Sequence, residues 1–164
     1  MIAACKSDQD KKFEQKDKNF YPIASFIESE LFLVDSLPLA VFKYTIDETG
    51  TDTQLVAKPD FRKIAETFMS PDITIEPLKE KYTETVFMDE TINTVTFSYS
   101  TEDTTAEIRK IDVFINPEND RVKNIYVEKI NRGSDSIIIR KMIWTAGKHF
   151  QVSTVLSKSG MPDK

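Results

Sequence analysis

The chain is poor in the residues that build cross-links and metal centres. Its 164 residues include one cysteine, one histidine and four glycines. The single thiol, that of Cys5, cannot form an internal disulfide, and the single imidazole, that of His149, is too few for a zinc site of nitrogen and sulfur ligands. Four glycines leave little room for a glycine-rich phosphate loop, and the chain has no such motif. We therefore expect neither a metal nor a cofactor.

Long apolar runs and excess positive charge are also missing. No stretch reaches the roughly 18 apolar residues that span a bilayer as a helix. The formal net charge is −5 at pH 7, whereas a nucleic-acid-binding domain usually carries a basic patch. We expect no nucleic-acid partner, and we expect any membrane attachment to use a lipid.

Cys5 closes the run Ile2-Ala3-Ala4-Cys5, in which an aliphatic residue and two small residues precede the cysteine. This pattern resembles the lipobox of bacterial lipoproteins, where the cysteine receives a diacylglycerol and the chain is cut before it. The resemblance implies that residues 1–5 are the remnant of a lipoprotein signal, whose complete form has a basic and an apolar segment before the cleavage site. It also implies that Cys5 carries the acyl anchor, with the several acyl chains that stable attachment requires.

Lysine, serine and aspartate follow the cysteine, at Lys6, Ser7, Asp8 and Asp10. This order resembles the surface-export signal of Bacteroidota lipoproteins. The stretches SLPLAVFKYT, DFRKIAETF and IWTAGKHFQV are similar to small lipoproteins of that phylum. The resemblance implies an outer-membrane lipoprotein that faces the periplasm or the cell surface, and it implies no particular activity.

The segment 6–19 is highly charged, and Phe13 is its only large apolar residue. Such a segment cannot bury enough apolar surface to order itself, so we expect a flexible tether. A flexible chain of this length spans about 20 Å. We expect one globular domain over residues 20–158 and a short tail over residues 159–164.

Two helices are predicted before residue 71. Pro22 suits a first helical turn, Ile23, Ile27 and Leu31 share one helical stripe, and Leu37-Pro38 ends the segment. The second helix covers residues 58–70, between the pairs Lys58-Pro59 and Ser70-Pro71.

The remaining periodicity is that of strands. A hairpin is predicted with strands 39–47 and 53–57 around a turn at 48–52. Six further strands are predicted at 83–88, 94–100, 108–116, 121–130, 136–144 and 149–157. Because the connections are short, the strands should form an antiparallel meander. The predicted fold class is α+β, with two N-terminal helices packed on a curved antiparallel β-meander of about six to eight strands. The alternative is a lipocalin-like barrel or a half-barrel resembling lipid carriers.

The strand faces differ in polarity. Val95, Phe97 and Tyr99 alternate with polar residues, which predicts one solvated face. The run from Ile137 to Ile139 is apolar on both faces. Because two helices can cover only one face, the second face would need a curl of the sheet, a ligand or a partner.

Trp144 and Phe150 form the strongest aromatic cluster, either as a platform for a glycan or lipid or as core packing at the final hairpin. His149 is predicted to lie at the solvent edge of a strand. Glycosidase-type catalysis would need two carboxylates that converge across a cleft. Three acidic pairs in predicted turns are the candidates: Asp47-Glu48, Asp89-Glu90 and Glu102-Asp103.

The sequence favours a non-enzymatic, lipid-anchored binding or assembly lipoprotein of the cell envelope. Its expected partners are the membrane, through the acyl anchor on Cys5, and a protein or apolar ligand. One alternative is a carrier that holds a lipid or other apolar molecule inside a curled sheet. The other is a hydrolase that uses strand-end carboxylates.

Overall fold

The computed structural model describes residues 19–158. The predictions for Cys5, for the signal remnant 1–5, for nearly all of the tether and for the tail 159–164 lie outside the described residues. None of the helices within residues 19–158 has the length and apolar character needed to cross a bilayer.

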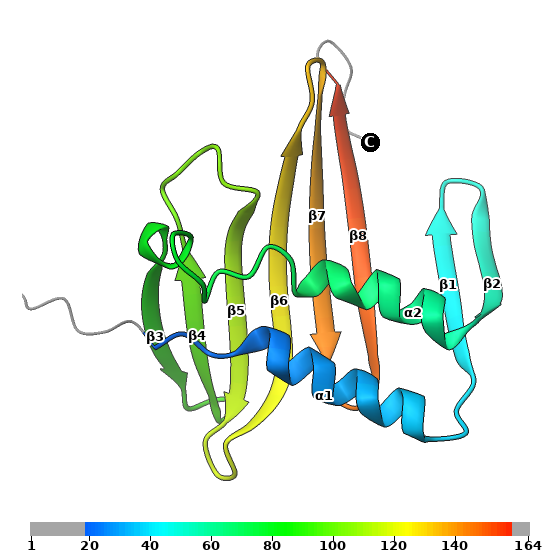
Figure 1. The fold of residues 1–164 in the computed structure, drawn as a ribbon, viewed down its shortest axis with the longest axis horizontal. Coiled ribbons are helices and arrows are strands. Elements are labelled where there is room, and N and C mark those ends of the chain that lie inside the picture. The colour runs from blue at the N-terminus through cyan, green and yellow to red at the C-terminus, as the bar shows by residue number, and fades with distance from the viewer. Residues whose placement is uncertain (1–18, 159–164) are drawn as a thin grey trace, which may run out of the picture.

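Helices and strands alternate early in the chain, and strands alone fill its second half (Figure 1). This arrangement confirms the α+β class and the six C-terminal strands. In chain order the elements are α1 (Ile23–Ser36), β1 (Val41–Asp47), β2 (Gly50–Val56), α2 (Lys58–Ala65), the 3-10 helices η1 (Glu66–Phe68) and η2 (Lys79–Lys81), β3 (Thr83–Asp89), β4 (Thr94–Ser100), β5 (Ile108–Asn116), β6 (Arg121–Arg132), β7 (Ser136–Thr145) and β8 (His149–Lys158).

The main sheet has six strands in the order β3-β4-β5-β6-β7-β8, and each neighbouring pair is antiparallel. This confirms the predicted meander. Within the described residues the sheet does not close, because β3 and β8 form its two edges. The lipocalin-like closed barrel was therefore wrong. The two strands that could have extended the meander, β1 and β2, pair only with each other.

The β1–β2 hairpin is tighter than predicted. Its turn is Glu48-Thr49 alone, and residues 50–52, expected in the turn, belong to β2. The Asp47 carboxylate accepts hydrogen bonds from the Thr49 amide (2.7 Å) and the Thr49 hydroxyl (2.5 Å). Gly50 adopts φ +139°, a conformation that only glycine tolerates well. These local features close the loop in two residues.

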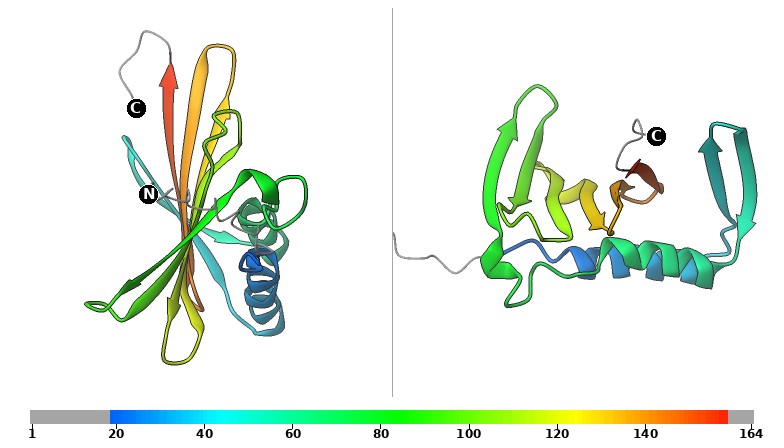
Figure 2. Two further views of the ribbon diagram at one scale, coloured as in Figure 1. Left: turned by 90° about the vertical axis from the view of Figure 1, so that its left-hand side faces the viewer. Right: turned by 90° about the horizontal axis from the view of Figure 1, so that it is seen from above.

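Helix α1 buries Ile23, Ile27 and Leu31, whose four-residue spacing puts them on one stripe. The helix ends at Leu37, which is extended as expected before Pro38. Both α-helices lie across the same face of the β3–β8 sheet, and no described element covers the other face (Figure 2).

Arg62 of α2 joins the two helices. Its guanidinium donates to Glu28 (3.0 Å) and to Asp35 (2.8 Å) of α1. Because these groups are partly exposed, the ion pairs orient the helices more than they stabilise them.

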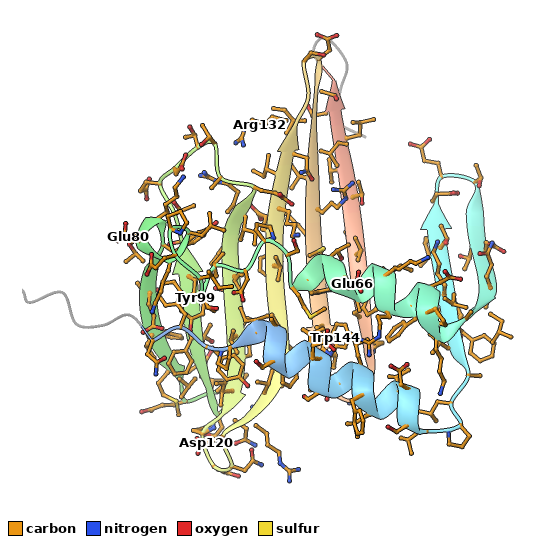
Figure 3. All side chains as sticks on the ribbon, in the orientation of Figure 1. Glu66, Glu80, Tyr99, Asp120, Arg132 and Trp144 are labelled. Atoms are coloured by element: carbon orange, nitrogen blue, oxygen red, sulfur yellow. The ribbon has the colours of Figure 1, made fainter. Side chains whose placement is uncertain are left out.

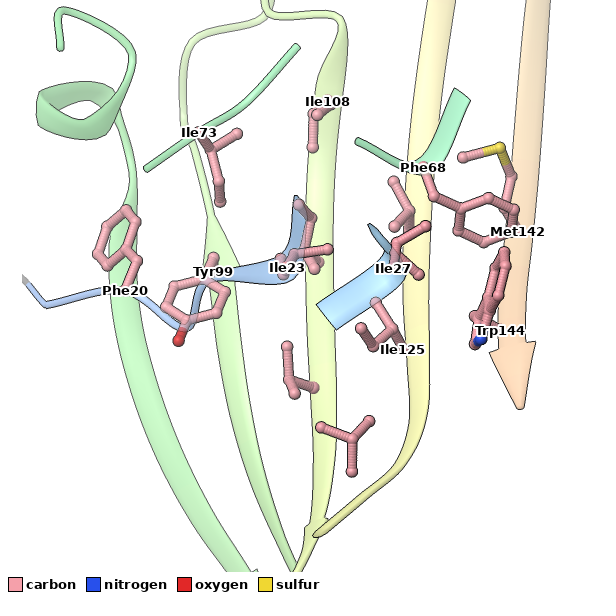
Figure 4. Close-up of a cluster of buried hydrophobic side chains, with 14 of the residues drawn as sticks. Phe20, Ile23, Ile27, Phe68, Ile73, Tyr99, Ile108, Ile125, Met142 and Trp144 are labelled. Carbon is pink, nitrogen blue, oxygen red and sulfur yellow. The ribbon is translucent and has the colours of Figure 1, made fainter. Parts of the chain in front are cut away.

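The core lies between the helices and the covered face of the sheet (Figure 4). Ile27 of α1 and Phe68 of η1 face the buried strand residues Ile125 and Met142. The N-terminal end of the described chain closes the core at β4, where Phe20 contacts Tyr99 with ring centroids 4.6 Å apart.

Candidate binding face of the sheet

The two faces of the sheet differ sharply in composition. Directly paired residues of antiparallel strands point to the same side. The register Tyr99, Ile111, Val127, Met142 therefore places four buried residues on the helix-covered side. We call the opposite side the open face.

Two neighbouring rows of side chains, polar except for Ile143, cross the centre of the open face. The register defines both rows across β4, β5, β6 and β7. The first row is Ser98, Asp112, Tyr126 and Ile143, and the second is Ser100, Lys110, Glu128 and Lys141.

Asp112 is the unusual member of these rows. The residue is only 7% exposed although it lies on the open face. Its Oδ2 forms an ion pair with Lys110 Nζ at 2.9 Å, whereas its Oδ1 is buried and has no hydrogen-bond partner among the described residues. A buried carboxylate oxygen without a donor is unfavourable, and buried polar groups of this kind are rare.

Tyr126 lies beside Asp112 on β6, and its hydroxyl donates to Glu128 Oε2 at 2.9 Å. Burial, followed by the hydrogen bond to Glu128 and the charges of Glu128 and Asp112, raises the pKa of Tyr126 to about 12. The phenol therefore stays protonated at neutral pH and remains a hydrogen-bond donor.

Aromatic side chains flank the polar rows. Phe87 of β3 and Phe114 of β5 share the next row of the same face, joined through Thr96. Phe87 is well exposed and Phe114 is half-buried. The centre of the open face thus combines carboxylates, ammonium groups, hydroxyls and aromatic rings, which can hydrogen-bond to a ligand and pack against it.

The apolar run at Ile137–Ile139 divides between the two faces. Ile137 and Ile139 lie on the open face, where Ile139 pairs with Ile130 and Val155. Ile138 points to the other side. These residues form an apolar end to the open face and do not extend across its polar centre.

Trp144 lies in the core and is only 4% exposed. Its ring stacks on Phe150 (5.2 Å) and meets the edge of Phe68 (5.4 Å), and its indole N–H donates to Glu30 of α1 (3.3 Å) (Figure 3). These surroundings are those of a core residue, which was one of the two interpretations of this cluster.

The three acidic turns lie at separate ends of the molecule (Figure 1). In each turn the aspartate binds the turn itself: Asp47 accepts from Thr49, Asp89 from the amide of Thr91, and Asp103 from Thr105. Asp103 also forms an ion pair with Lys81 at 3.0 Å. The positions of these turns do not bring their carboxylates together across a cleft.

Lys129 is a buried cation that the sequence analysis missed. Its ammonium donates to the Ser70 carbonyl and lies 3.5 Å from Glu107 Oε1. Burial lowers the pKa of Lys129, and the Glu107 charge opposes this effect. These contacts hold the loop after η1 against β6, which is a structural role.

His149 is exposed at the start of β8, as expected. Among residues 19–158, no group of three or more histidine, cysteine, aspartate or glutamate side chains could hold a metal ion.

The open-face cluster was also not predicted from the sequence, although part of its signal was present. The alternation Lys110, Asp112, Phe114 against Ile111 and Val113 marks a mixed outer face. The burial of Asp112 depends on neighbours from β4 and β6, and pairing between strands is not visible in one segment.

Comparisons with protein-family models, with curated proteins and with solved structures found no match for this chain. The resemblance to Bacteroidota lipoproteins therefore stays a prediction.

Proposed function

We propose that this chain is a non-enzymatic, lipid-anchored binding module of the cell envelope and that the open face of its main sheet binds the ligand. Asp112 is the main support for this proposal. Its buried Oδ1 has no hydrogen-bond donor among residues 19–158, and it lies at the centre of a face that no described element covers. An arrangement that is unfavourable for the free protein is explained if ligand binding moves the side chains that cover Oδ1 and supplies the missing donor.

The composition of the face indicates the ligand's chemistry. Two ammonium groups, on Lys110 and Lys141, balance the two carboxylates of Asp112 and Glu128. A face without net charge favours a neutral ligand with many hydrogen-bonding groups over an ionic one. Carboxylate and hydroxyl oxygens together with exposed aromatic rings suit a hydroxyl-rich molecule such as an oligosaccharide.

The anchor is supported by the lipobox at residues 2–5. The described chain begins at Asn19, close to β3 and β4, so a lipidated Cys5 would tether the molecule from that end (Figure 1). The other two functions considered from sequence have less support. The polar centre of the open face does not suit an apolar cargo, and the acidic turns lie apart.

Two experiments test the two halves of this proposal separately. Cells fed an alkyne fatty acid should label the wild-type protein, and Cys5→Ala should abolish both the label and membrane partitioning. Unchanged partitioning of Cys5→Ala would refute the anchor.

Ligand binding is tested with neutral oligosaccharides on a glycan array, followed by calorimetry. Asp112→Asn should weaken binding about tenfold or more, because it loses a charge-assisted acceptor. Asp60→Asn, the same change on exposed α2, is the matched control and should bind like the wild type. Equal affinity of Asp112→Asn and the wild type would refute this site.

A further inference from the structure

The β1–β2 hairpin extends from the molecule without support. It connects α1 to α2 and lies beyond β8, at the end opposite to Asn19, as both Figure 1 and Figure 2 show. Every residue of the hairpin is exposed except Val41 and Val56 at its base. An isolated two-stranded hairpin is only marginally stable in water, and the described residues cover neither face of this one.

One face of the hairpin is apolar and the other is polar. The cross-strand pairs Phe42–Leu55, Tyr44–Thr53 and Ile46–Thr51 share the apolar face. Lys43 pairs with Gln54, and Thr45 with Asp52, on the other face. We call Phe42, Tyr44, Ile46 and Leu55 the hairpin stripe; they are 55%, 67%, 79% and 70% exposed.

We propose that the hairpin stripe is a self-association surface through which two copies of this chain pack face to face. Because only one face of the hairpin is apolar, a pair related by a two-fold axis buries all of the stripe and ends the assembly at a dimer. This inference is independent of the ligand proposed for the open face.

The exposed area of the stripe is sufficient for a weak dimer. At exposed fractions of 55–79%, each of its side chains leaves roughly 130 Å² accessible, if a large side chain offers about 200 Å² in full. Pairing two stripes would remove at most about 1,000 Å² from water in total, which corresponds to a weak, reversible interface.

Analytical ultracentrifugation of the full chain tests the proposal. At roughly 100 µM the wild type should be mostly dimeric if its Kd is micromolar. Ile46→Asp, which places a charge in the stripe, should raise the dimer Kd about tenfold or more. Gln54→Asp, on the polar face opposite Lys43, is the matched control and should dimerise like the wild type.

Circular dichroism should show that both variants keep the main sheet, because the hairpin contributes no residue to the buried core. A wild type that stays monomeric at this concentration would overturn the proposal, and so would a dimer that Ile46→Asp leaves intact. A monomer that binds lipid vesicles through Ile46 would also overturn it, in favour of membrane contact.

Discussion

Replacing Asp112 by threonine should stabilise the fold, although it removes half of an ion pair. A buried polar atom without a partner costs about 1–3 kcal/mol. The ion pair with Lys110, whose side chain is 45% exposed, contributes at most about 1 kcal/mol. Threonine has nearly the same volume as aspartate and favours strands. We therefore expect Asp112→Thr to raise the free energy of unfolding by about 1 kcal/mol.

Urea unfolding followed by circular dichroism measures this difference. With a slope of about 2 kcal/mol per molar, the midpoint should rise by about 0.5 M at unchanged slope. The same variant should lose ligand binding on the open face, so stability and function should change in opposite directions.

The other half of the ion pair provides the control. Lys110→Met leaves the Asp112 carboxylate buried without its counter-charge and should lower the free energy of unfolding by about 1–3 kcal/mol. Opposite signs for the two variants are the signature of an unsatisfied buried carboxylate. A lower urea midpoint for Asp112→Thr would refute this account and would mean that Asp112 serves the fold.

Three further predictions concern the core and pH. Ile27→Ala, at a position with 0% exposure, should cost about 2–5 kcal/mol in urea unfolding, and a loss below 1 kcal/mol would contradict the assigned core. Burial, with the charge of Asp103 as a smaller cause, raises the pKa of Tyr82 to about 12. The stability that comes from its neutral phenol should therefore be lost as the pH rises from 10 to 12. Tyr82→Phe should remove that part of the alkaline loss of stability, and an equal loss in both proteins would contradict the shift. Hydrogen bonds from Thr105, and then the contact with Lys81, hold the pKa of Asp103 well below its usual range. The contribution of the ionised Asp103 to the free energy of unfolding should therefore be present above about pH 4 and lost in more acidic solution. Asp103→Asn should lower the thermal unfolding midpoint at pH 7 and have little effect on it in strong acid.

The strands of the main sheet were predictable because their signals are local. Alternation sets each strand, and short polar turns such as 116–120 separate them, so most predicted bounds lie within two residues of those observed. Contacts between distant segments were not predictable. Glu30 accepts from the indole N–H of Trp144, which lies 114 residues later in the chain, and this contact helps to decide that Trp144 belongs to the core.

The position of the hairpin could likewise not be predicted from local sequence patterns. The hydrophobicity of Phe42, Tyr44 and Ile46 predicts a strand but does not say which partner covers it. The prediction of about six to eight strands left open whether the hairpin joins the meander. The structure leaves them paired only with each other.

Each of the two proposed surfaces contains a departure from ordinary folding rules. On the open face a carboxylate oxygen is buried without a donor, and on the hairpin four large apolar side chains face solvent. Either arrangement is unfavourable for the isolated chain, whereas the core between the helices and the sheet is conventionally packed. If the departures were only tolerated imperfections, Asp112→Thr and Ile46→Asp would improve stability or solubility and change no interaction. The measurements above separate these cases, because each variant is expected to lose one interaction while its matched control keeps it.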